Sequence, residues 1–145
     1  MSDARLGRRL SAAAGVLLVL AATAHTIGHV PLLFGIERSG SVAAMAEDHE
    51  ILGLGMAPSM LDIHLALVLT LSVTFVALGA ITLSVALADA DAELRRIVWI
   101  DAIAVGVLVV VYAYYRIPPP LVSTVLVEAL LVAALLQSRG STRKV

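Results

Sequence analysis

The chain has 145 residues, of which 60% are hydrophobic and only 14% are charged. A soluble domain has about 25% charged and about 45–50% apolar residues, so one soluble core cannot hide this apolar excess. The net charge of -1 comes without a basic segment, which argues against a nucleic-acid partner, and the absence of cysteine excludes disulfides and thiolate chemistry.

Four apolar segments have about the length of a membrane-spanning helix, which needs roughly 20 residues. Because lipid offers no hydrogen-bond partners to the backbone, each segment should be an α-helix. We therefore predict an all-α, up-down four-helix bundle, a single transmembrane domain over residues 1–145. The predicted helices are Leu10–Phe34, Met60–Ala88, Ile97–Tyr115 and Leu121–Gln137.

The first of these segments also has to be distinguished from a signal peptide. The apolar region of a signal peptide is about 7–15 residues long. Here the run continues from Leu10 to Phe34, although Ala22-Thr23-Ala24 resembles a cleavage site. We expect the segment to be retained as a spanning helix.

The connections between the helices differ in character. Gly35–Ser59 is long, and within it Ser41–Leu52 is predicted to form a short helix that lies on the surface or covers the bundle mouth as a lid. Asp89–Arg96 is a short charged link, and Pro118-Pro119-Pro120 forms the last turn. The long connection should lie outside the cell.

Charge near the helix ends predicts the orientation, because cytoplasmic loops of membrane proteins are rich in Lys and Arg. One side has eight such residues, and the other side has two. The eight are Arg5, Arg8, Arg9, Arg95, Arg96, Arg139, Arg143 and Lys144, and the two are Arg38 and Arg116. We predict a multi-pass protein of the bacterial plasma (inner) membrane with both termini in the cytoplasm.

Ionisable residues within the apolar segments are costly and mark candidate sites. His25 and His29 share one face of the first helix, and Asp62 opens the second. These residues should lie in the outer half of the bundle, with Glu128 below them near the midplane. We predict that all four point inward and border one cavity, where they are the candidate catalytic residues. The candidate ligand-binding residues around them are His64, Tyr112, Tyr115 and Arg116.

Three hypotheses remain open for this polar layer. In the first, the side chains pair with one another and fix helix packing, with Gly28 allowing close approach. In the second, they line a pocket for a hydrophobic small molecule, where imidazole and carboxyl groups move protons. In the third, His25 and His29 chelate a metal ion or haem, and Asp62 adds an oxygen ligand. We expect no cofactor, with the metal or haem as the alternative.

Other polar residues have structural interpretations. Glu128 on its own is consistent with a neutral carboxyl bonded to a neighbouring helix. Hydroxyls in membrane helices usually bond back to their own helix. This expectation applies to Thr70, Ser72, Thr74, Thr82 and Ser84. Asp101 lies apart, in the cytoplasmic third of its helix.

Three stretches of sequence carry a resemblance to known families. They are Ala24-His25-Thr26-Ile27-Gly28-His29, the loop Met45–Gly53, and Leu61-Asp62-Ile63-His64-Leu65. In these stretches and in its overall layout, the chain resembles small bacterial four-helix membrane proteins of the DoxX-like group and related families. This resemblance implies the fold and no reaction. In its intramembrane residue types, the chain also resembles emopamil-binding-type isomerases, which have more helices and act on a sterol.

Together these patterns predict a small membrane protein that binds a hydrophobic small molecule in the outer half of its bundle. Acid–base chemistry by histidine and carboxyl groups would make it an isomerase, cyclase or hydrolase-like enzyme. The alternative is a non-catalytic structural or partner-subunit bundle, or a metal- or haem-binding protein. The bilayer is the expected partner, and assembly as a homo-oligomer is compatible with the sequence.

Overall fold

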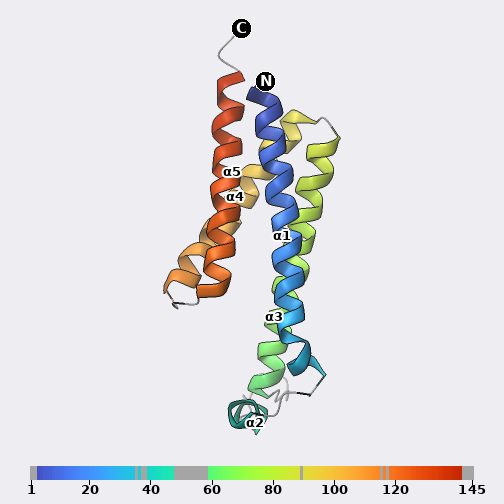
Figure 1. Cartoon of the computed structure of the whole chain (residues 1–145), viewed down its shortest axis with the longest axis vertical. Coiled ribbons are helices and arrows are strands. Elements are labelled where there is room, and N and C mark those ends of the chain that lie inside the picture. Colours follow the sequence, from blue (N-terminus) through green and yellow to red (C-terminus); the bar gives the residue numbers. More distant parts are fainter. Residues whose placement is uncertain are drawn as a thin grey trace, which may run out of the picture. The chain divides into compact units, whose positions relative to one another are not determined.

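The protein is all-α in the computed structural model, which describes residues 3–34, 36, 39–47, 59–88, 90–114, 116 and 118–141 (Figure 1). Its helices are α1 (Asp3–Leu33), α2 (Gly40–Glu47), α3 (Met60–Leu87), α4 (Asp91–Tyr114) and α5 (Pro118–Ser141). All of them except α2 are long and apolar enough to cross a membrane. The prediction of an all-α, multi-pass membrane bundle is confirmed.

The α4 and α5 helices begin earlier than predicted, because their first turns contain charged residues or prolines. The α4 helix begins at Asp91, so most of the expected charged link is helical. Asp91 and Glu93 occupy its first turn, where carboxylates interact favourably with the helix dipole. The α5 helix begins at Pro118, because proline is tolerated in a first turn whose N–H groups have no partner in the helix.

The contacts of the chain divide it into two compact units, which we describe separately. The core unit is 1–21 together with 75–145, and it contains the start of α1, the end of α3, and all of α4 and α5. The hairpin unit is 22–74, and it contains the end of α1, α2 and the start of α3.

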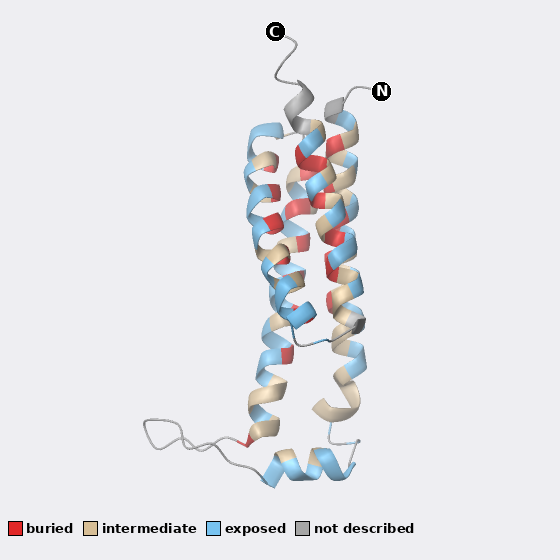
Figure 2. Ribbon diagram, turned by 90° about the vertical axis from the view of Figure 1, so that its left-hand side faces the viewer, coloured by how far each residue is buried: buried red, intermediate tan, exposed pale blue. Residues whose placement is uncertain are grey.

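Buried residues lie on the facing sides of the core unit's helices (Figure 2). They recur at helical spacing, as in Ala14 and Leu18 of α1 and Val98, Ala102 and Val105 of α4. The opposite faces carry exposed aliphatic side chains. A helix that is apolar on both faces is expected where one face meets lipid.

Two glycines bring α1 and α3 close together in the core unit. A Cβ atom added to Gly79 would lie 2.6 Å from the carbonyl oxygen of Gly15, and one added to Gly15 would lie 2.8 Å from that of Gly79. No larger residue fits unless a backbone moves. Small residues at a crossing allow this close packing, which drives helix association in lipid.

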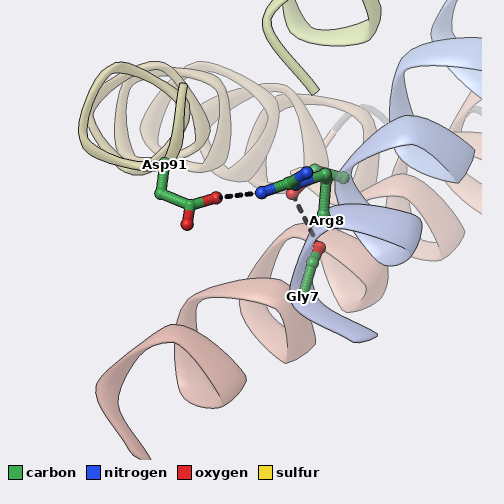
Figure 3. Close-up of polar contacts among 4 residues, drawn as sticks. Gly7, Arg8 and Asp91 are labelled. Atoms are coloured by element: carbon green, nitrogen blue, oxygen red, sulfur yellow. Dashed lines mark hydrogen bonds and ion pairs between the residues drawn. The ribbon is translucent and has the colours of Figure 1, made fainter. Parts of the chain in front are cut away.

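An ion pair joins α1 to the start of α4. The guanidinium of Arg8 donates a hydrogen bond to the Asp91 carboxylate over 2.7 Å (Figure 3). Close to it, Ser11 donates to the carbonyl of Gly7 within α1 over 3.0 Å. The pair thus joins the second turn of α1 to the first turn of α4.

The hairpin unit buries few of its described side chains; they are Ala22, Ser59, Val68 and Ser72. The α3 helix begins with a reciprocal cap, in which the Ser59 hydroxyl accepts from the Asp62 N–H and the Asp62 carboxylate accepts from the Ser59 N–H. The α2 helix occupies the first part of the predicted Ser41–Leu52 helix and has no buried residue. Residues 48–52 of that prediction lie outside the described part of the chain, and its role as a lid stays a prediction.

Candidate functional site

A groove of about 380 Å³ runs along the seam between α4 and α5 in the core unit. Its walls come from one face of each helix, at spacings of three and four residues. The lining residues are Trp99, Ala102 and Ile103 of α4, and Glu128, Val132, Leu135 and Leu136 of α5. Ile103 and Leu136 are well exposed at its edge, so the groove opens on the helix surface that meets lipid.

Glu128 is the ionisable residue of this groove. It lies in the middle of the spanning part of α5, Pro120–Gln137. Its Oε2 atom is buried and has no hydrogen-bond partner among the described residues. An unsatisfied buried polar atom costs about 1–3 kcal/mol, so a bound partner for this oxygen would recover free energy.

Gly106 of α4 keeps the space beside the carboxyl open. A Cβ atom at this position would lie 3.6 Å from Oε1 of Glu128. Gly106 also continues the α4 face that carries Trp99, Ala102 and Ile103. A larger side chain here would extend towards the carboxyl and narrow the groove.

The groove extends from Glu128 towards Trp99 and Leu136, which lie nearer the ends of α4 and α5 that carry Arg95, Arg96 and Arg139. The pocket that the sequence predicted in the outer half of the bundle stays a prediction. The groove itself was not predictable from single helices, because it forms where the apolar faces of α4 and α5 meet.

Three histidines gather in the hairpin unit. The ring centres of His25 and His29 are 4.6 Å apart, and those of His29 and His64 are 5.6 Å apart. The first two lie in the last turns of α1, and His64 lies in the second turn of α3. All three side chains are half-buried. Of the residues predicted to share one polar layer, His25, His29 and His64 lie together within this unit.

One hydrogen bond within this histidine cluster fixes the orientation of the His29 ring. The Nδ1 atom of His29 donates to the carbonyl oxygen of His25 over 2.8 Å, because a carbonyl can only accept. A neutral His29 therefore has its lone pair on Nε2. The Nε2 atom of His25 is buried and has no hydrogen-bond partner among the described residues.

The ring nitrogens of the three histidines do not point towards one common position in the structure. No group of three or more His, Asp or Glu side chains within the described ranges is arranged to hold a metal ion. Asp62, which the metal hypothesis offered as an oxygen ligand, accepts hydrogen bonds from the N–H and hydroxyl of Ser59 instead. Its carboxylate caps α3.

The remaining predicted site residues lie apart from the groove walls. Tyr112 is buried in α4. Arg116 is exposed in the turn after α4, where its φ of 54° is left-handed and its N–H donates to Ala113. Tyr115 lies outside the described residues. That His25, His29, Asp62 and Glu128 border one cavity stays a prediction, since they belong to different units.

A buried pair in the core unit was not predicted. Asp101 is only 1% exposed, and its carboxylate accepts a hydrogen bond from the hydroxyl of Thr82 on α3. We expected Thr82 to bond back to its own helix, which is wrong. Thr70, Thr74 and Ser84 do bond back. The only signal in the sequence was a lone aspartate in an apolar segment, which required a partner somewhere.

The role expected for Gly28 is also wrong. Apart from its chain neighbours and the backbone of its own helix, nothing in the described structure lies within 4 Å of a Cβ atom built on it. The close approach between helices occurs at Gly15 and Gly79 instead. Because Gly28 lies on the exposed part of α1, it leaves open space beside the histidine cluster.

Comparisons of the chain with protein-family models, curated proteins and solved structures gave no match.

Proposed function

We propose that the groove between α4 and α5 binds a hydrophobic small molecule that enters from the bilayer. The observation that carries this proposal is the buried, unpartnered Oε2 of Glu128 inside an otherwise apolar groove. Ligand pockets typically have apolar walls, a few polar groups that fix orientation, and volumes of about 300–1,000 Å³. The volume of about 380 Å³ suits a molecule with one ring system or a single alkyl chain.

Glu128 makes the polar contact with this molecule. Trp99 is the other side chain of the groove with a polar atom, and its indole N–H can only donate. A carboxyl group can donate when protonated and accept in either state. The ligand therefore has an apolar body and at least one polar group, such as a hydroxyl or carbonyl, that reaches mid-span.

Proton exchange is the chemistry that this arrangement supports. A carboxyl held in an apolar site can give a proton to a bound group and take one back. In the proposed function, Glu128 performs this exchange as the proton donor and acceptor of an isomerase-type reaction. The histidines belong to the hairpin unit, and the proposal assigns them no step at this groove.

Tryptophan fluorescence tests binding directly, because Trp99 is the one tryptophan of the chain and lines the groove. The probe is a long-chain alcohol brominated along its chain, whose bromine quenches indole on contact. We expect saturable quenching in the wild-type protein in detergent and at least tenfold weaker binding in Glu128→Gln, which keeps the size of the side chain.

A pair of variants separates groove occupancy from general contact with the probe. Gly106→Leu places a leucine side chain beside Glu128, whereas Val107→Leu places the same side chain on an exposed neighbouring face. Only the first should abolish saturable quenching. Linear, unsaturable quenching that is equal in all variants would contradict the proposal.

We also propose that the protein lies in a bacterial plasma membrane with both termini in the cytoplasm. Eight of the ten Lys and Arg residues support this orientation. The chain has no native cysteine, so single cysteines can report each side. In intact cells, an impermeant thiol reagent should label Ser41→Cys and leave Ser2→Cys and Ser141→Cys unlabelled. The reverse pattern would overturn the orientation.

A further inference from the structure

The histidine cluster of the hairpin unit has features that packing alone does not require. Three imidazole rings from two helices lie within 5.6 Å of a neighbouring ring centre. No hydrogen bond or ion pair joins these rings to a carboxylate among the described contacts. The cluster also lies outside the groove proposed for the hydrophobic ligand.

We propose that His25, His29 and His64 bind one divalent transition-metal ion of the Zn²⁺ class. Imidazole nitrogen is a preferred ligand of such ions, and sites with three protein ligands leave the fourth position to water or an anion. This site goes beyond the proposed function of the groove and does not depend on it.

The two ring separations that involve His29 fit a shared ion. With metal–nitrogen distances of about 2.0–2.1 Å and a tetrahedral angle, two imidazole ring centres on one ion lie about 5 Å apart. The observed separations of 4.6 and 5.6 Å are on either side of that value. His25 and His29 are also four residues apart on α1, a spacing that lets two histidines of one helix bind the same ion.

The hydrogen bonding of the cluster matches that of metal-binding histidines. A histidine ligand usually donates its second ring N–H to a carbonyl or carboxylate, which orients the ring. His29 makes this bond from Nδ1 to the carbonyl of His25, so its Nε2 lone pair is available. The buried Nε2 of His25 has no partner and gains one when an ion binds.

Ion binding requires the rings of His25 and His64 to turn towards His29, because the donors do not converge in the described structure. Rotation of an imidazole about its Cβ–Cγ bond has a broad, soft energy profile. The space beside Gly28 is open, and the three side chains are only half-buried. These features give the rings room to turn.

Zinc titration of the full-length protein tests this proposal. Protein in detergent is stripped with a chelator, and Zn²⁺ binding is measured by calorimetry. We expect one ion per chain and at least a tenfold loss of affinity in each of His25→Ala, His29→Ala and His64→Ala. His49→Ala is the matched control, because His49 is the one remaining histidine of the chain, and this variant should bind zinc as the wild type does.

A second measurement needs no variant and so does not depend on folding of a mutant. Zn²⁺ should protect His25, His29 and His64 of the wild-type protein from acylation by diethyl pyrocarbonate, mapped by mass spectrometry, and should leave His49 reactive. Absence of stoichiometric zinc, loss of binding in His49→Ala, or loss confined to the His25 and His29 variants would each overturn the three-histidine site.

Discussion

The core unit and the hairpin unit place their carboxylates differently. In the core unit, Asp101 is buried at mid-helix and accepts a hydrogen bond from Thr82 on a neighbouring helix. In the hairpin unit, Asp62 lies at an exposed helix start and bonds to Ser59, three residues earlier. One carboxylate thus joins two helices, whereas the other completes the end of one helix.

Packing follows the same division. The core unit has a glycine crossing without room for a methyl group, while Gly28 of the hairpin unit has empty space beside it. Close packing gives the core unit its stability and a fixed frame for the groove at Glu128. The looser hairpin unit leaves the rings of its histidines room to turn. Substitutions should therefore be costly in the core unit and mild in the hairpin unit.

The largest effect is expected at the glycine crossing. Gly79→Leu places a side chain where even a Cβ atom is 2.6 Å from the Gly15 carbonyl, so α1 and α3 must separate. Overpacking typically costs about 1–3 kcal/mol, and this backbone clash belongs at the upper end or above. The free energy of unfolding in mixed detergent micelles measures the loss.

Gly28→Leu is the matched control for that substitution, because no described atom of another helix lies within 4 Å of its Cβ position. Its effect should stay within about 0.5 kcal/mol, as for most surface substitutions. If the two variants lose similar stability, the contrast between the packed and the open unit is wrong.

A smaller effect is expected from the buried pair. Thr82→Val keeps the shape of the side chain and removes the hydroxyl that donates to Asp101. The buried carboxyl is then left without this donor, which costs about 1–3 kcal/mol. The same unfolding measurement checks it.

Thr70→Val provides the comparison, since the exposed Thr70 hydroxyl bonds to Ala66 of its own helix and joins no second element. This variant should be nearly neutral. The double variant Thr82→Val/Asp101→Leu should be more stable than Thr82→Val alone, because both polar partners are gone. Additive losses in the double variant would show that the two side chains do not interact.

The smallest effect is expected at the ion pair between α1 and α4. Exposed ion pairs contribute about 0.2–1 kcal/mol and are screened by salt. Asp91→Asn removes the charge that pairs with Arg8, and Glu93→Gln in the same turn is the control. The difference in stability between the two variants should shrink as salt is added from low ionic strength. A difference that salt leaves unchanged would exclude a screened surface pair.

Hydropathy was sufficient to predict the four long helices, because each apolar segment has to satisfy its own backbone in lipid. It placed α3 within one residue at either end, at Met60–Ala88 against Met60–Leu87. It failed at the start of α4, which continues beyond the apolar segment to Asp91. Helices do not end where the apolar segment ends, since charged first turns are stable in water.

The sequence predicted individual residues of the candidate site but not the residues that they contact. The insertion cost of Glu128 marked it in the sequence, and so did the helical spacing of His25 and His29. Their partners were not predictable, because they depend on which helix faces meet. Thr82 pairs with Asp101 of another helix, and Gly106 lies opposite Glu128. For the same reason the sequence emphasised Gly28, whereas the crossing forms at Gly15 and Gly79.

The central claim is that the groove at Glu128 holds a hydrophobic ligand. Photochemical mapping in bilayers tests it most directly. A long-chain alcohol with a diazirine is incorporated into vesicles that contain the protein, and the labelled residues are identified by mass spectrometry. The proposal predicts labels concentrated on groove residues such as Ile103 and Val132, lost in Gly106→Leu and kept in Val107→Leu. Labels spread evenly over lipid-facing residues such as Val73 and Val110, and unchanged by Gly106→Leu, would contradict it.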